Sequence, residues 1–274
     1  MLSTRSARAF FLTLLAFVLV ACLPATASAE TKPRRTDVGG ATPNSILWVG
    51  NSFFYYNNSM HSHVINLVRA ADPKSTPRAT SVTISGSGID WHDMDSYFRP
   101  NGIGKYSFVG DNEIVFNQPG RQFDTVIIAD CSQCPIHPQL KAVFHEYAKK
   151  QSDVVKANGA RPIFFMTWAY KDKPEMTALL AEQYTIAGNT NDALVIPAGL
   201  AFAKAIAKRP DLELYQPDKR HPTLIGTYLA ACATYAAVYK KSPVGNTYTA
   251  GLELGTARSL QEVAMETVQE YFGI

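Results

Sequence analysis

A serine, an aspartate and a histidine occupy positions from which they could act together in nucleophilic catalysis. Ser52 follows an apolar run, residues 46–49, that is typical of a buried strand, and a Gly-Asn turn separates the two. Asp218 precedes His221 by three residues, just ahead of an expected helix. A serine hydroxyl is a weak nucleophile unless a base lies within hydrogen-bond reach and a third group orients that base. The order Ser…Asp…His supplies all three groups and indicates a serine hydrolase.

Alternating strands and helices must position these three residues. Five short apolar runs with turn signals around them predict strands that are buried on both faces of a parallel sheet. They are residues 45–49, 81–84, 125–129, 162–166 and 193–196. Helical patterns occupy residues 59–71, 140–158, 174–187, 223–239 and 257–272. This alternation predicts an α/β protein, a three-layer α/β/α sandwich with right-handed crossovers.

Residues 89–123 are the irregular part of the chain. They contain glycines, prolines and several aromatic residues but show no clear strand or helix period. A connection of this length in a compact domain usually serves a function or contains short strands of its own. We expect a loop or a small hairpin beside the active site.

Residues 1–29 have the pattern of a signal peptide. Two arginines precede an apolar run over residues 9–20, and the Ala-Ser-Ala sequence at residues 27–29 is a small-residue cleavage site. We therefore expect an exported protein, periplasmic or secreted. An overlapping Leu-Val-Ala-Cys sequence that ends at Cys22 resembles a bacterial lipobox. The alternative is thus a lipoprotein that is anchored to a membrane through Cys22.

The composition indicates one globular domain after this leader. The chain has 274 residues, of which 46% are hydrophobic and 18% charged, enough to bury one large core. Residues 30–44 are expected to form a flexible tether, followed by a hydrolase domain over residues 45–274. The net charge of +3 includes Arg5 and Arg8 of the leader, so the mature chain is nearly neutral. This balance argues against nucleic acid as a partner and against a polybasic membrane patch.

The cysteines and histidines do not form a metal-binding pattern. His61 and His63 are two residues apart on an expected helix and cannot share a face, so we expect no metal site. In an exported protein, Cys131 and Cys134 could close a small disulfide. The alternative is that these two cysteines and Cys232 are small buried thiols.

The segments that carry the catalytic candidates resemble two sequence blocks of the SGNH hydrolase superfamily, the GDSL-type esterases and lipases. The Gly-Asn-Ser sequence that ends at Ser52 is similar to the first block, and the Asp-x-x-His-Pro sequence over residues 218–222 resembles the last. The resemblance runs from residue 45 to about residue 239. It implies a flavodoxin-like, five-stranded parallel sheet of order 2-1-3-4-5. It also implies hydrolysis of acyl esters by a triad of Ser52, Asp218 and His221, without a metal or a cofactor.

The same resemblance implies an oxyanion hole, a set of donors that stabilises the negative charge of the transition state. In this family the donors are the backbone N–H of the nucleophile, that of a glycine after the second strand, and an asparagine amide after the third. Ser52 and Gly86 match the first two, and Gly86 is preferred to Gly88. Residues 129–134 contain no asparagine. Gln133 could supply an amide instead, with the neighbouring Ser132 as the second candidate.

Aromatic residues near the expected crevice are candidates for binding the substrate. In an open parallel sheet the crevice lies at the carboxyl ends of the strands. Trp168 and Tyr170 follow the fourth strand at this edge, and Trp91 lies in the irregular segment. We expect these residues to bind a small-molecule or glycan ester of the cell envelope. Two alternatives remain open: an acyltransferase that uses a sugar hydroxyl as acceptor, and a catalytically weak, carbohydrate-binding relative.

Overall fold

The computed structural model describes residues 31–100, 102–103, 106–110, 113–116 and 120–274. The expected signal peptide, residues 1–29, and the lipidation candidate Cys22 lie outside the described residues. In the described part of the chain, no helix combines the length and the apolar character needed to cross a bilayer.

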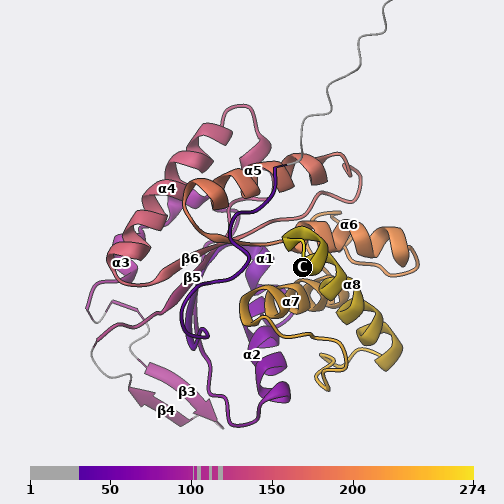
Figure 1. Ribbon diagram of the computed structural model, residues 1–274, viewed down its shortest axis with the longest axis horizontal. Coiled ribbons are helices and arrows are strands. Elements are labelled where there is room, and N and C mark those ends of the chain that lie inside the picture. Colours follow the sequence, from indigo (N-terminus) through magenta and orange to yellow (C-terminus); the bar gives the residue numbers. More distant parts are fainter. Residues whose placement is uncertain (1–30, 101, 104–105, 111–112, 117–119) are drawn as a thin grey trace, which may run out of the picture. The chain divides into compact units, whose positions relative to one another are not determined.

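Five parallel strands form the central sheet (Figure 1). They are β1 (Ser45–Gly50), β2 (Arg78–Thr83), β5 (Thr125–Ile128), β6 (Arg161–Phe165) and β7 (Leu194–Ile196). Their order in the sheet is β2-β1-β5-β6-β7. Numbered among themselves along the chain, these strands have the order 2-1-3-4-5, so the predicted topology is confirmed. The direction of winding changes between β1 and β5, which is where such sheets open a crevice at their carboxyl edge.

Strands β1, β5, β6 and β7 are almost entirely buried because both faces of the sheet are covered there, whereas the edge strand β2 has no buried residue. Side chains alternate across a strand, so Ile46 and Trp48 of β1 pack into one core while Leu47 and Val49 pack into the other. All four side chains are at most 3% exposed. Burial on both faces explains why the sequence shows continuous apolar runs where a half-exposed sheet would show alternation.

Helices cover the two faces in separate groups (Figure 1). The first core contains residues of α2 (Met60–Ala71), α6 (Ala198–Lys208), α7 (Leu224–Tyr239) and α8 (Leu254–Phe272). The second core contains residues of α3 (Met94–Tyr97), α4 (Lys141–Ala157) and α5 (Met176–Thr190). The predicted three-layer α/β/α sandwich is therefore confirmed.

Helix α6 is absent from the elements that the sequence patterns predict. Its second residue, Gly199, lies so close to the backbone of Thr167 that a Cβ atom would be 2.3 Å from that carbonyl oxygen. The close approach requires glycine, which lowers helix propensity. A packing demand from another part of the chain thus fixes the glycine at the start of this helix.

The irregular segment contains a hairpin, as expected. Strand β3 (Tyr106–Gly110) pairs with β4 (Glu113–Phe116) in an antiparallel sheet of their own. Two helical turns precede the hairpin, η1 (Ile89–Trp91) and α3.

The segment expected to be a flexible tether is held against the domain in its described part, residues 31–44. The Arg35 guanidinium pairs with the Asp192 carboxylate at 2.6 Å. The Arg34 N–H donates to the Asn189 side chain at 2.7 Å. These contacts reach the C-terminal end of α5 and the turn after it, so the expectation of a free tether is corrected.

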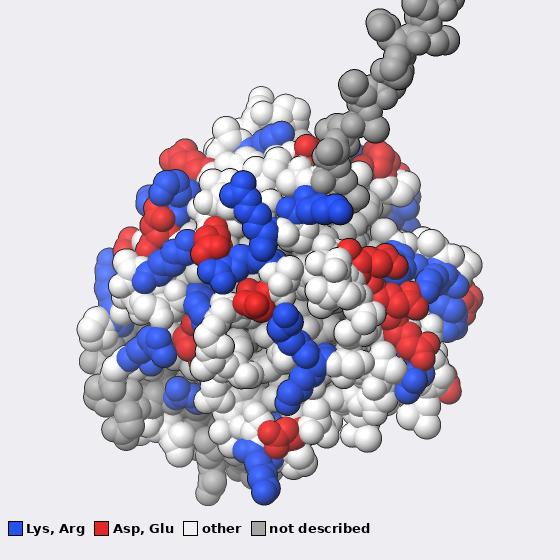
Figure 2. All heavy atoms as spheres, viewed as in Figure 1, with Lys and Arg blue, Asp and Glu red and all other residues white. Residues whose placement is uncertain are grey.

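Charges of both signs are mixed on the surface. On the face shown in Figure 2, basic and acidic side chains are intermingled. Exposed ion pairs include Lys149–Asp153 and Lys171–Glu213, with N···O distances of 2.6 and 2.5 Å. Such a surface agrees with the nearly neutral charge of residues 30–274.

Candidate active site

The three residues predicted to form a catalytic unit meet in the structure. His221 Nε2 lies 2.8 Å from Ser52 Oγ, and His221 Nδ1 lies 2.5 Å from the Asp218 carboxylate. When Nδ1–H donates to this carboxylate, Nε2 carries the lone pair that accepts the Ser52 hydroxyl proton. The arrangement is that of a nucleophile, a base and a group that orients the base.

The Asp218 carboxylate holds together the turn on which it lies. Burial would raise its pKa, but hydrogen bonds from the His221 ring and from the N–H groups of Arg220 and His221 lower this pKa to about 2. The carboxylate is therefore ionised at neutral pH. It can balance the positive charge that His221 acquires when the ring takes a proton.

Aromatic rings fix the imidazole of His221. The Tyr56 ring stacks on it with a centroid distance of 4.4 Å, and the Phe53 ring meets it edge-on at 5.8 Å. Both rings come from the segment directly after Ser52. One short stretch of chain therefore holds the nucleophile and orients its base.

Asn51 caps α1 (Ser52–Tyr55), the short helix that begins with the nucleophile candidate. Its Oδ1 accepts a hydrogen bond from the Phe53 N–H at 3.2 Å. Its Nδ2 group donates to the Ser87 carbonyl at 3.0 Å and to the Asp130 carbonyl at 3.1 Å. One buried side chain thus joins the loops that follow β1, β2 and β5. Sequence patterns do not show this role, because both carbonyl partners are distant along the chain.

Gly50, the last residue of β1, has no room for a side chain. A Cβ atom there would lie 2.9 Å from the Phe54 ring. The Gly50 carbonyl accepts from Ser87 Oγ at 3.2 Å and from His92 Nε2 at 3.1 Å. Burial lowers the pKa of His92, so this ring is neutral at neutral pH. These contacts fix the turn that presents the nucleophile candidate, and His92 is a support that the sequence prediction missed.

Ser52 and Gly86 carry the two backbone N–H groups predicted to act as oxyanion donors. Neither the Ser52 N–H nor the Gly86 N–H donates a hydrogen bond to any residue that the structure describes. Gly86 has φ +72°, a conformation that favours glycine, and its Cα faces open space. The next residue, Ser87, ties this turn to the nucleophile turn. The assignment of Gly86 as an oxyanion donor stays a prediction that this geometry permits.

A second chain of hydrogen bonds reaches the histidine turn from α2. Asn57 Nδ2 donates to the Pro222 carbonyl at 2.9 Å and to Thr227 Oγ1 at 2.8 Å, while the Asn57 carbonyl accepts from the His63 ring at 2.6 Å. Asn57 begins a run of three residues with positive φ. Asparagine tolerates this conformation better than most residues, so the polar Asn-Asn-Ser sequence is the signal that could have revealed this support.

No protein-family model and no curated protein matches this sequence, whereas several solved structures do. A DUF4886 family protein from Bacteroides uniformis has a TM-score of 0.55 at 16% identity, covering 83% of this chain and 95% of that chain. A candidate SGNH hydrolase from Slackia heliotrinireducens has a TM-score of 0.52 at 23% identity, covering 70% and 97%. A catalytic mutant of an acetylxylan esterase from Geobacillus stearothermophilus has a TM-score of 0.52 at 13% identity, covering 78% and 97%.

This chain has the SGNH hydrolase fold. The likeness lies in the fold, and the chemistry follows from the side chains that the fold brings together. Ser52 comes directly after the first strand of the sheet, and His221 precedes α7. The SGNH resemblance stated from the sequence predicts both placements.

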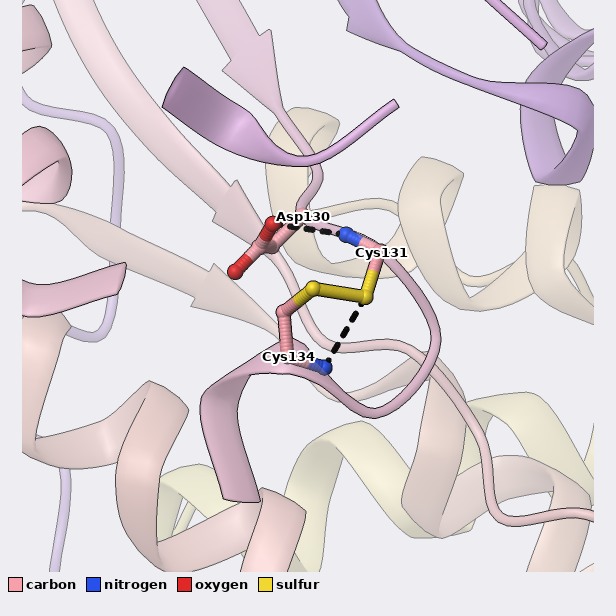
Figure 3. A group of neighbouring side chains, drawn as sticks. All are labelled: Asp130, Cys131 and Cys134. Atoms are coloured by element: carbon pink, nitrogen blue, oxygen red, sulfur yellow. Dashed lines mark hydrogen bonds between the residues drawn. A yellow bond between two sulfur atoms is a disulfide. The ribbon is translucent and has the colours of Figure 1, made fainter. Parts of the chain in front are cut away.

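The loop after β5 is where this SGNH fold departs from the pattern that the resemblance implies (Figure 3). Cys131 and Cys134 form a disulfide, and the buried Asp130 precedes it. Asp130 Oδ1 accepts from the Ile89 and Cys131 N–H groups, both at 2.7 Å. Its Oδ2 has no hydrogen-bond partner among the described residues. Burial raises the pKa of this carboxyl group to about 7.

The cluster in Figure 3 places one carboxylate and two sulfur atoms within 4.8 Å of one another. Cysteine binds a metal as a thiolate. The Cys131 and Cys134 sulfurs are bonded to each other, so neither is a thiolate. The cluster is a disulfide beside a buried carboxyl group. The third cysteine, Cys232, is unpaired and buried, and burial raises the pKa of its thiol.

Gln133 is the side-chain amide of this loop that is available to an oxyanion. It is exposed and makes no side-chain hydrogen bond within the part of the chain that the structure describes. The amide of Asn51 already donates to two carbonyls. Ser132, the second candidate, shares a hydrogen bond of 2.6 Å with the Tyr170 hydroxyl. The role of Gln133 remains a prediction.

Trp168 does not reach solvent, so the prediction that it contacts the substrate is corrected. Its ring is 0% exposed and is stacked between Phe53 at 4.4 Å and Phe202 at 4.1 Å. Its Nε1–H donates to the Arg220 carbonyl at 2.9 Å. Trp168 therefore supports the turn that carries His221.

Tyr170 and Trp91 differ in exposure. Tyr170 is 9% exposed, and its hydroxyl shares a hydrogen bond with Ser132 Oγ. The Arg220 guanidinium lies over the Tyr170 ring, 5.3 Å from its centre. Trp91 is 60% exposed. Of the three aromatic residues predicted to bind substrate, Trp91 thus offers the most free surface. The position of a residue in the sequence indicates at which edge of the sheet it lies, but it does not indicate how far its side chain is buried.

Removing the disulfide is expected to lower the free energy of unfolding by about 2 kcal/mol, because the bridge no longer constrains a short loop of the unfolded chain. The bridged cysteines are three positions apart. The double variant Cys131→Ser/Cys134→Ser should therefore unfold at a lower urea concentration than the oxidised wild type. Wild-type protein that has been reduced with dithiothreitol should unfold at the same urea concentration as the variant. Equal midpoints for the oxidised wild type and the double variant would contradict this expectation.

Proposed function

We propose that this protein is a serine hydrolase that cleaves acyl esters. The observation that carries the proposal is the hydrogen-bond chain from Ser52 through His221 to Asp218, with distances of 2.8 and 2.5 Å. The shared fold of an acetylxylan esterase supports ester hydrolysis as the general class of reaction.

The reaction begins when Ser52 Oγ attacks the acyl carbonyl carbon and its proton passes to His221 Nε2. Asp218 stays ionised and stabilises the imidazolium. The N–H groups of Ser52 and Gly86, with the Gln133 amide as third donor, stabilise the oxyanion. His221 then gives its proton to the leaving alcohol as the ester C–O bond breaks, and the acyl group remains on the serine. Water, deprotonated by His221, attacks the acyl-enzyme; the bond from the acyl carbon to Ser52 Oγ breaks, His221 returns the proton to Ser52 Oγ, and the acid is released.

The proposal includes the place of action and the class of substrate. The leader pattern of residues 1–29 supports export to the periplasm or the medium, with anchoring through Cys22 as the alternative. The exposed Trp91 supports an ester carried by a glycan or another envelope component, because an exposed indole can stack on a sugar ring.

A fluorophosphonate probe tests the proposed function. The mature protein, residues 30–274, should hydrolyse p-nitrophenyl acetate and should lose this activity when the probe reacts. Mass spectrometry of the digested protein should then locate the phosphonate on Ser52. Hydrolysis that persists after complete reaction, or a label on a different residue, would contradict the assignment of the nucleophile.

Replacing Gln133 by alanine is expected to lower kcat about 10-fold with little change in KM. The amide would act on charge that develops mainly in the transition state, so its loss affects kcat more than binding. Initial rates with p-nitrophenyl acetate measure both constants. Gln139→Ala, which removes an exposed glutamine further along the same connection, is the matched control. An unchanged kcat in folded Gln133→Ala would leave the oxyanion hole to backbone N–H groups.

A further inference from the structure

A cavity of about 260 Å³ lies between α4 and the segment that runs from η1 to α3. Asp90, Trp91 and Asp95 line it on one side, and Tyr147 and Lys150 of α4 line it on the other. Sites for drug-sized ligands have volumes of about 300–1,000 Å³, so this cavity suits a smaller group. The residues of the catalytic unit do not line it.

The cavity combines an aromatic ring with hydrogen-bond acceptors and a hydrogen-bond donor. Trp91 is 60% exposed. The Asp90 and Asp95 carboxylates accept no hydrogen bond, and Lys150 forms no ion pair, within the residues that the structure describes. The Lys150 ammonium lies 5.1 Å from the centre of the Tyr147 ring instead. Acceptors and a donor are therefore available to a ligand.

Gln151 of α4 forms a buried part of the cavity wall. It is 2% exposed and lines the cavity. Its Nε2 donates to the Ile89 carbonyl at 2.5 Å, whereas its Oε1 has no partner within the described residues. The Gln151 side chain therefore joins α4 to η1 at the wall of the cavity.

We propose that this cavity binds a sugar ring of the substrate. A pyranose presents C–H groups to an indole face and hydroxyl groups to carboxylate and ammonium side chains. Three aspartates line the cavity, Asp93 being the third, against one lysine, which disfavours a phosphate or another anion. Lys150 already lies over the Tyr147 ring, so a quaternary ammonium at that ring would meet a like charge.

His92 connects the cavity to the candidate catalytic turn. It lines the cavity, and its Nε2 lies 3.1 Å from the carbonyl oxygen of Gly50, two residues before Ser52. Trp91 follows the oxyanion candidate Gly86 by five positions in the chain. His92 thus links the wall of the cavity to the turn that carries Ser52. The inference rests on the proposed function and specifies its substrate class, an acyl ester of a saccharide.

Tryptophan fluorescence tests the cavity without turnover. The chain has three tryptophans, and Trp48 and Trp168 are 1% and 0% exposed, so the neutral quencher acrylamide reports on Trp91. In mature Ser52→Ala protein, xylotetraose, cellotetraose and chitotetraose are titrated against acrylamide quenching, with choline chloride as the control ligand. We expect saturable protection by at least one saccharide and none by choline. Protection by choline alone, or by none of the four, would overturn the proposal.

Kinetics separate failure of the cavity from failure of the proposed function. In Trp91→Ala, the ratio of kcat/KM for acetylated xylotetraose to that for ethyl acetate should fall about 10-fold, because ethyl acetate has no ring to stack on an indole. Leu254→Ala, which truncates a 75% exposed side chain at the start of α8, should keep the wild-type ratio. A wild type that hydrolyses neither ester rejects the proposed function. Hydrolysis of both esters with an unchanged ratio in Trp91→Ala rejects only the sugar site.

Discussion

Replacing Ser52 by alanine is expected to lower kcat for p-nitrophenyl acetate by at least about 10⁴-fold, because binding and oxyanion donors alone then remain. Ser52 Oγ is the group that His221 Nε2 contacts at 2.8 Å, and within the described residues this nitrogen has no other hydrogen-bond partner. The substitution removes one hydrogen bond from the fold. The free energy of unfolding should therefore change by only about 1 kcal/mol.

Non-additivity distinguishes a catalytic unit from two separate contributions. His221→Ala should reduce kcat to a similar level, and the double variant Ser52→Ala/His221→Ala should be barely slower than either single variant. Ser81→Ala, which alters an exposed serine of β2, is the matched control and should retain full activity. A folded Ser52→Ala protein with wild-type kcat would reject the triad.

The sheet and the contacts within the candidate catalytic unit could be predicted because their signals are mostly local. Strands β1, β5, β6 and β7 lie in mostly apolar runs because both faces of the sheet are buried at these strands, whereas the edge strand β2 is half-exposed. Asp218 and His221 are three residues apart on one turn, so their contact requires no long-range information. The alternation of strands and helices then places Ser52 at the edge where this turn arrives.

The supports of the site could not be predicted in the same way because they depend on contacts between distant segments. The sequence places Asn51 in the turn before Ser52, yet its amide joins loops that lie 36 and 79 positions away. Trp168 has the position of a pocket residue, but Phe53 and Phe202 enclose its ring. Position along a strand gives the edge at which a side chain lies, whereas packing decides whether it reaches solvent.

Asp130 should make the stability of the domain decrease as the pH rises. Burial raises the pKa of its carboxyl group to about 7, compared with about 3.9 in an unfolded chain. Between these values the folded state binds more protons than the unfolded state, so the free energy of unfolding falls with increasing pH. The buried rings of His61, His63 and His92 have pKa values lowered by burial and act in the opposite direction below about pH 6.5. The pH dependence of the free energy of unfolding of the wild type is therefore the sum of these contributions. A variant is needed to isolate the contribution of Asp130.

Asp130→Asn retains the oxygen that accepts from Ile89 and Cys131 but cannot ionise. The difference in the free energy of unfolding between the variant and the wild type should be about 2 to 3 kcal/mol larger at pH 8 than at pH 5, in favour of the variant. Urea unfolding at both pH values measures this difference, and the histidine contributions cancel because both proteins contain them. Asp153→Asn, which alters an exposed carboxylate of α4, is the control and should show no such change. If the difference between Asp130→Asn and wild type were the same at both pH values, the Asp130 carboxyl group would already be ionised at pH 5. Its unpartnered oxygen would then require a donor from outside the described residues.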